Sequence, residues 1–187
     1  SDPSRGLGDV YKRQLSSKDW SHTLAMEEYL RELIDSARNI KILAQKHSEK
    51  PLTKMVIQTS PLWKSELASD AIEMSLSDFD FRAKGQDYLK NLPIFSNESL
   101  RGEIFQTWIS MTSGTKKKRG RINTWSYGQK TLLRNGFDES SMINMNSSFI
   151  ANSLGIENVE SYRVGEGEDV AGKARVSFPL EPGIAFL

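Results

Sequence analysis

The stretch KMVIQTS, residues 54–60, decides the fold of this chain. Its length and its β-branched content are typical of a buried strand. The polar stretch HSEKP, residues 47–51, precedes it. Ser60 follows as a candidate N-cap, with Pro61 at the first position of a helix that continues through Leu62 toward Met74. We therefore expect a central strand that connects two helices.

The first of these helices covers the stretch AMEEYLRELIDSARNIKILAQK, residues 25–46. Apolar residues recur there at steps of three and four, which predicts a long amphipathic helix with one buried stripe. Acidic residues lie toward its start and lysines toward its end, the order that the helix dipole favours. The stripe consists of Met26, Leu30, Leu33, Ala37, Ile40 and Ala44.

Further helices are expected on the C-terminal side of the strand. Ser77 is a candidate N-cap, and Pro93 ends or kinks the helix between them. Residues 96–111 form a helix with Ile104 and Trp108 on one face. The stretch MINMNSSFIANSLG, residues 142–155, resembles a helix that ends at its last glycine.

Two more strands complete the pattern, ENVESYRV at residues 157–164 and GIAFL at residues 183–187. The resulting order is α-β-α-α-α-α-β-β. It predicts an α+β or α/β-like domain, in which helices pack on a short sheet and the terminal strands join the central strand.

Charge is strongly segregated along the chain, although the net charge is only +1. Residues 104–137 contain no Asp or Glu and carry seven cations, whereas residues 138–169 hold seven acids against Arg163 alone, a net charge of −6. This asymmetry favours one face that binds a polyanion. The cations are Lys116, Lys117, Lys118, Arg119, Arg121, Lys130 and Arg134.

The stretch TSGTKKKRGRINTWSYGQ, residues 112–129, is expected to be an exposed loop, because it has three glycines and no apolar period. Each cation from Lys116 to Arg121 can neutralise one RNA phosphate. Trp125 and Tyr127 follow at once and could stack on unpaired bases. The alternative is an ordinary solvated loop.

Several classes of function are disfavoured. No apolar run is long enough for a membrane helix, and the absence of cysteine fits a reducing compartment, so we expect a soluble cytoplasmic protein. Glycine-rich phosphate loops and zinc-protease motifs do not occur. His22 and His47 have no metal or triad partner nearby in sequence, and Asp78 and Asp80 fit a turn better than an acid–base pair. We expect no catalytic residue, no metal ligand and no cofactor in this chain.

Three stretches carry a resemblance to a known family. The first is EEYLRELIDSARNIKIL followed by KMVIQTSPLWKSEL, the second FIANSLGIENVESYRVGEGED, and the third EDVAGKARVSFPLEPGIAFL. Together they resemble the C-terminal region of archaeal-type leucyl-tRNA synthetases. Val170 departs from the family, which usually has proline there, and residues 115–125 have no firm counterpart. The matching tail residues are Asp169, Gly172, Lys173, Ala174, Pro179, Pro182, Gly183 and Ile184.

The resemblance implies a part of leucine–tRNA ligase, which joins leucine to its tRNA using ATP and Mg²⁺. The His-Ile-Gly-His and Lys-Met-Ser-Lys-Ser signatures of its catalytic core do not occur here. Residues 15–50 would then end a helical anticodon-binding-type domain, and residues 51–187 would form a small domain that reaches the long variable arm of leucine tRNA. The partners implied are tRNA(Leu) and the other domains of the synthetase.

The tail supplies three more candidate RNA contacts. Lys173 and Arg175 lie in the matching motif and either contact RNA backbone or hold a turn through Asp169. The last residues, 182–187 with Leu187 at the end, either pair as a strand or meet bases of the variable arm.

Residues 1–14 are set aside as a non-native leader, because GDVYKRQ back-translates to a sequence that resembles a sequencing-library adapter.

Two rival functions stay open. One is a stand-alone RNA-binding module that is unrelated to synthetases. The other is a protein-interaction domain that uses the stripe of residues 26–44 as a seam for a partner helix.

Overall fold

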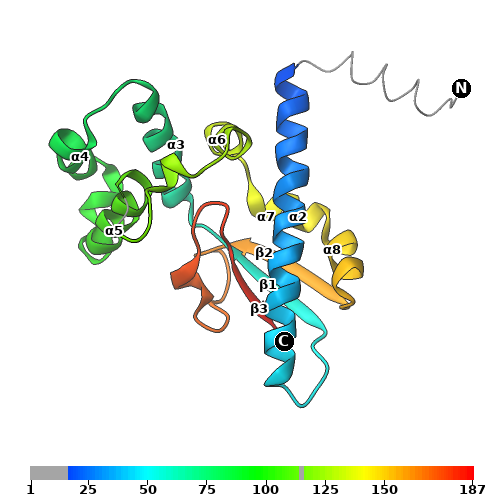
Figure 1. Cartoon of the computed structure of the whole chain (residues 1–187). Coiled ribbons are helices and arrows are strands. Elements are labelled where there is room, and N and C mark those ends of the chain that lie inside the picture. Colours follow the sequence, from blue (N-terminus) through cyan, green and yellow to red (C-terminus); the bar gives the residue numbers. More distant parts are fainter. Residues whose placement is uncertain (1–16, 114–115) are drawn as a thin grey trace, which may run out of the picture.

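The computed structural model describes residues 17–113 and 116–187, and its sheet has the predicted three strands. β1 (Lys54–Thr59) lies in the middle, between β2 (Asn158–Arg163) and β3 (Gly183–Phe186). β1 pairs with β2 in parallel and with β3 antiparallel. The two terminal strands therefore join the central strand as expected, and the α+β class is confirmed (Figure 1).

Helix α2 (Ser17–Lys46) runs across the sheet and begins before the stretch that the periodicity marks (Figure 1). Its Leu33 and Ala37 are buried in one core together with Met55 and Ile57 of β1. This confirms the amphipathic helix and shows that its apolar stripe is covered by the chain itself. The division expected near residue 50 does not separate two cores, because residues on both sides of it share this one.

A second core forms to one side of the sheet, among four helices. α3 (Leu62–Leu76) follows β1, and α4 (Phe81–Lys90) and α5 (Arg101–Thr112) pack beside it (Figure 1). α6 (Tyr127–Arg134) connects the two cores, because Leu132 packs in the first and Leu133 in the second. Two short 3₁₀ helices, η1 (Pro93–Ser96) and η2 (Glu98–Leu100), lead into α5.

Three expected helix boundaries were wrong. Ser60 does not cap α3, because the N-cap residue is Pro61 and its carbonyl accepts the first backbone hydrogen bond. Ser77 ends α3 instead of starting α4, whose N-cap is Asp80 with its carboxylate on the Ala83 N–H. The helix expected over residues 142–155 is two helices, α7 (Glu139–Met145) and α8 (Ser147–Leu154).

Other boundaries agree with the sequence. Gly155 ends α8 in the left-handed conformation at φ 64°, which glycine adopts without steric cost. Pro93 lies past the end of α4, which stops at Lys90. The leader at residues 1–14 lies outside the described residues. Of the helices that the structure describes, none is both long enough and apolar enough to cross a membrane.

Candidate nucleic-acid interface

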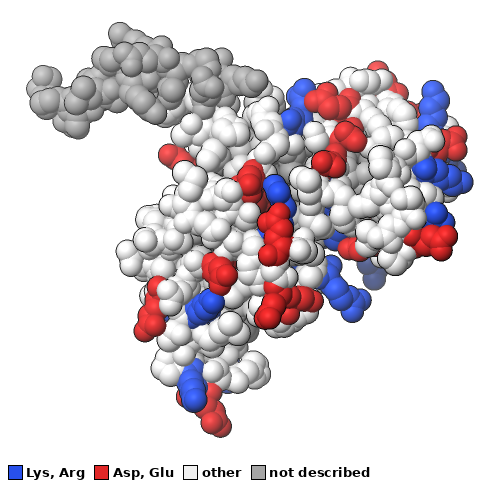
Figure 2. Space-filling view, turned by 180° about the vertical axis from the view of Figure 1, so that it is seen from behind, with Lys and Arg blue, Asp and Glu red and all other residues white. Residues whose placement is uncertain are grey.

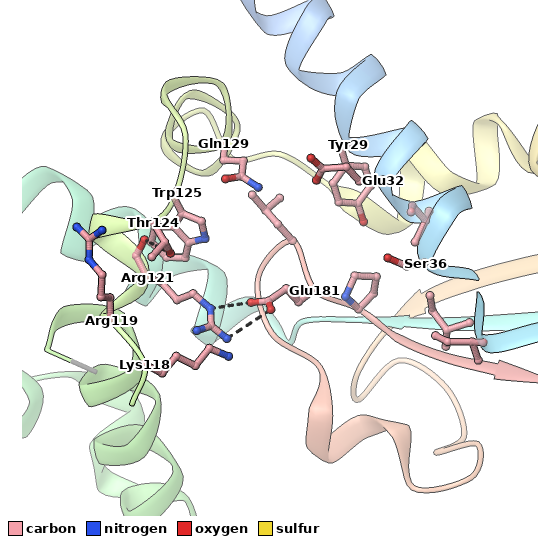
Figure 3. Close-up of a pocket in the computed structure, with 15 residues that line it drawn as sticks. Tyr29, Glu32, Ser36, Lys118, Arg119, Arg121, Thr124, Trp125, Gln129 and Glu181 are labelled. Carbon is pink, nitrogen blue, oxygen red and sulfur yellow. Dashed lines mark hydrogen bonds and ion pairs between the residues drawn. The ribbon is translucent and has the colours of Figure 1, made fainter. Parts of the chain in front are cut away.

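A groove of about 610 Å³ separates α2 from the segment that follows α5. Figure 3 shows Tyr29, Glu32 and Ser36 of α2 on one side and residues 118–129 on the other. The segment just before β3 forms the end of the groove, with Glu181 and Pro182. The groove therefore brings together three parts of the chain that are far apart in sequence.

Residues 116–121, here called the basic segment, are held against α5 by a close backbone contact. Gly120 is buried, and a Cβ atom built on it would lie 2.7 Å from the carbonyl oxygen of Thr112. A short 3₁₀ helix, η3 (Arg121–Asn123), follows and buries Ile122 in the second core. Ser126 then caps α6 in a reciprocal capping box with Gln129. The expected loop is thus exposed at residues 116–119, 123–124 and 126–127, with Gly120, Ile122 and Trp125 buried between them.

Arg121, a predicted RNA contact, pairs with an acidic side chain in the groove. Its Nε lies 2.8 Å from Oε2 of Glu181, and its Nη2 donates to Oε1 at 3.4 Å (Figure 3). The guanidinium also lies 5.1 Å from the ring centre of Phe178. The Arg121 side chain is only 15% exposed. It therefore holds the segment before β3 against η3 and contributes little positive charge to the surface that a ligand would meet.

The other cations of the basic segment lie at the surface of the protein. Lys116, Lys117, Lys118 and Arg119 are all exposed. Lys118 and Arg119 also line the groove, and Figure 3 shows Lys118 extending toward Glu181 while Arg119 points away from it. These four side chains form a basic rim at the groove.

The prediction that Trp125 stacks on an unpaired base was wrong for the protein as folded. Its side chain is 7% exposed and belongs to the second core, where one edge lines the groove. Tyr127 is 78% exposed at the first position of α6, so it is the aromatic ring that a base could reach. The sequence placed both rings in one loop and could not distinguish them.

The remaining candidates lie away from the groove lining. Lys173 and Arg175 belong to the 3₁₀ helix η4 (Lys173–Val176), where Arg175 is exposed and Lys173 is half-buried. The Asp169 carboxylate accepts a hydrogen bond from the Ala174 N–H at 3.0 Å, so the turn is held by this bond between a side chain and the backbone. Leu187 pairs with β1 through its backbone, which agrees with strand pairing for the last residues.

The buried carboxylate of Glu139 contacts two of the chain segments that line the groove. Glu139 is 6% exposed, and its Oε1 accepts a 2.7 Å hydrogen bond from the Tyr29 hydroxyl. Its Oε2 accepts from the Leu180 N–H at 3.1 Å, where Leu180 has a left-handed φ of 65°. The pKa of Glu139 is raised to about 7, chiefly by burial and to a smaller degree by the charge of Asp138, while the hydrogen bonds from Tyr29 and Leu180 and the charge of Arg163 oppose the rise. Burial next to Glu139 also raises the pKa of the Tyr29 hydroxyl.

Sequence reasoning missed Tyr29, Glu139 and Glu181 as determinants of the groove. Each lies in a stretch that was interpreted from its hydrophobic period or its charge. Neither signal can reveal that Tyr29 contacts Glu139, 110 residues away, or that Arg121 contacts Glu181, 60 residues away. Away from the groove, Figure 2 shows Lys and Arg mixed with Asp and Glu on the reverse face. Within the described residues, no three His, Asp or Glu side chains are placed to hold a metal ion.

Comparison with known proteins does not assign this chain to a family. A scan against protein-family models finds none that matches this chain, and a search of curated proteins finds no match either. The groove and its basic rim are therefore the features of this chain that point to a function.

Proposed function

We propose that this chain is the tRNA-binding C-terminal part of a leucyl-tRNA synthetase and that it binds leucine tRNA at the basic rim. The parent enzyme would ligate leucine to tRNA in the cytoplasm with ATP and Mg²⁺, and its catalytic core would lie outside this chain. The observation that carries RNA binding is the exposed run of four cations, Lys116 to Arg119, within 34 residues that lack any acid.

Phosphate contact fits the rim better than the groove itself. The groove lining holds Glu32 and the paired carboxylate of Glu181, which repel a phosphate that enters deeply. The rim side chains are long and exposed, so their charged ends can reach the phosphates of an RNA backbone. The backbone of the RNA would therefore run along the rim, with Tyr127 available to an unpaired base.

The assignment to leucine tRNA rests on the tail motif as well as on charge. The motif residues Gly183 and Ile184 start β3, and Pro182 lines the groove just before it. An RNA arm on the rim would thus lie beside the part of the chain that most resembles the synthetase tail. The rival seam for a partner helix loses support, because Leu33 and Ala37 are buried in this chain's own core.

The test is binding of the chain to leucine tRNA with and without its long variable arm, across a salt series. Replacing Lys116, Lys117, Lys118 and Arg119 by glutamine should reduce the slope of log affinity against log salt by about 2 to 4, because each lost phosphate contact removes close to one unit. The control replaces Arg82, Lys84 and Lys90, which are exposed cations of α4, by glutamine. This control should change the salt slope little.

The variable arm separates this proposal from its rivals. Loss of affinity when the arm is deleted supports leucine tRNA as the partner. Equal affinity for both RNAs would instead indicate the stand-alone RNA-binding module. An absence of binding at low salt would overturn RNA binding altogether.

A further inference from the structure

A hollow of about 480 Å³, here called the α3 hollow, lies in the group of helices that Figure 1 shows to one side of the sheet. One wall is α3, and the other is the connection between α4 and α5 at residues 92–94. The buried side chains of Leu67 and Ile104 also line it. None of the described residues that line this hollow belongs to α2. It is thus built by the C-terminal helices alone.

The lining of the α3 hollow is apolar except for two carboxylates. Glu66 and Asp70 are exposed and lie about one helical turn apart on α3. Among the described residues that line the hollow, no Lys or Arg balances them. Like charges at this spacing repel one another, so a cation bound between them would stabilise the helix.

The chain itself leaves these carboxylates open to a ligand. Glu66 forms no ion pair and no hydrogen bond with any residue in the described part of the chain. Asp70 accepts a hydrogen bond from the Tyr88 hydroxyl through Oδ2. Burial, this hydrogen bond and the charges of Asp70 and Glu66 all raise the pKa of Tyr88. The wall of the hollow therefore carries a negative potential.

An indole ring lies beside the two carboxylates. Trp63 is half-buried, because it packs against the second core and lines the hollow at the same time. The Lys64 ammonium lies 5.5 Å from the centre of this ring, but it is already paired with Oε1 of Glu103 at 2.9 Å. Its Nζ also donates to the carbonyl of Ser177 at 3.1 Å. Leu62, which is 51% exposed, extends the apolar lining toward the surface.

We propose that the α3 hollow binds an arginine side chain in a linear segment of a partner protein. A guanidinium is planar, stacks on aromatic rings and donates several hydrogen bonds at once, which matches an indole beside two carboxylates. The aliphatic stem of the arginine and its apolar neighbours in the segment would contact the apolar lining. The volume of the hollow lies within the range of about 300 to 1,000 Å³ that is common for ligand pockets.

The charges of the hollow disfavour other occupants. An RNA phosphate or an acidic segment would be repelled by Glu66 and Asp70. A purely apolar segment would cover the two carboxylates without giving them a partner. A lysine would match their charge but has no planar group to stack on Trp63. The basic rim contributes no residue to the hollow, so this proposal stands apart from RNA binding.

The test is a titration of the full chain with the peptide N-acetyl-leucyl-arginyl-leucinamide. Nuclear magnetic resonance spectra follow the indole N–H signal of Trp63, which the variant Trp63→Phe assigns. We expect a saturable shift of this signal. The same peptide with citrulline in place of arginine keeps the shape and loses the charge. It should bind about three- to tenfold more weakly.

Glu66→Gln should weaken binding of the arginine peptide by about three- to tenfold and change binding of the citrulline peptide little. Glu157→Gln is the matched control, because it removes an exposed carboxylate beside the start of β2, at the opposite end of the sheet from α3. This control should leave both affinities unchanged. Circular dichroism of each variant checks that helix content is kept.

Three outcomes would overturn the proposal. The first is the absence of a saturable shift with the arginine peptide. The second is equal affinity for the arginine and citrulline peptides, which would indicate an occupant that is recognised by its apolar surface alone. The third is a Glu66→Gln variant that binds the arginine peptide as tightly as the unchanged chain does.

Discussion

Glu139 connects three parts of the chain through one side chain. It lies at the start of α7, binds the Tyr29 hydroxyl of α2 and accepts the Leu180 N–H before β3. A buried carboxylate destabilises the folded state whenever it is ionised, because the charge has left water. The residue therefore links the stability of the groove to pH.

We predict that the free energy of unfolding falls as pH rises from about 4.5 to about 7. In this window folded Glu139 keeps a proton that the unfolded chain has released, since its pKa is raised from 4.5 to about 7. The total loss is about 3 kcal/mol by linkage, because each pKa unit corresponds to about 1.4 kcal/mol. Urea unfolding at a series of pH values measures it.

Glu139→Gln is the matched variant for this prediction. An amide can still accept from the Leu180 N–H and donate to the Tyr29 oxygen, so both contacts are kept. The difference in stability between the two proteins should grow in favour of the variant up to pH 8. A difference that does not depend on pH would show that Glu139 titrates normally.

At the scale of an element, the basic segment depends on its contact with α5. Gly120 has no room for a side chain, because a Cβ atom would meet the backbone of Thr112 and Met111 at 2.7 to 3.0 Å. Backbone atoms at the end of a packed helix cannot move aside cheaply. The glycine therefore places the basic rim beside the groove.

We predict that Gly120→Ala destabilises the protein by about 1 to 3 kcal/mol and weakens RNA binding, because the basic segment must move off α5. Gly102→Ala is the control within α5 itself, since nothing lies within 4 Å of its added Cβ. That change should be neutral or stabilising by up to about 1 kcal/mol. Thermal unfolding and RNA titration of both variants measure the effects; equal stabilities would contradict the close contact.

At the scale of the whole molecule, the last strand completes the sheet on which the first core is built. β3 buries Ile184 and Ala185 against the rest of the chain and covers one edge of β1. Without it, β1 would expose unpaired backbone groups along that edge. Helix α6 couples the stability of the two cores, because Leu132 packs in the first core and Leu133 in the second.

We predict that removal of residues 183–187 costs about 5 kcal/mol, which is comparable with the stability of many domains. The shortened chain should lose its near-ultraviolet circular dichroism or aggregate through β1. Leu187→Ala is the control, because the Leu187 side chain is 55% exposed and the substitution keeps the backbone hydrogen bonds to Thr53 and Lys54. A cooperative, native-like transition in the longer deletion would show that β3 is dispensable.

The sequence by itself determined the elements whose signals are local. The 3.6-residue period of α2, the β-branched content of β1 and the glycine after α8 each depend on neighbours along the chain, so their types could be predicted. The charge of residues 116–119 was equally visible.

Only the tertiary structure decided which of these residues act together. Local patterns do not distinguish a buried Trp125 from an exposed Tyr127, and they cannot show that Glu181 neutralises Arg121 from 60 residues away. These contacts arise when α6 and β3 pack around the sheet, where burial and pairing depend on the whole chain. The basic rim could thus be predicted from the sequence, whereas the groove beside it follows from the fold.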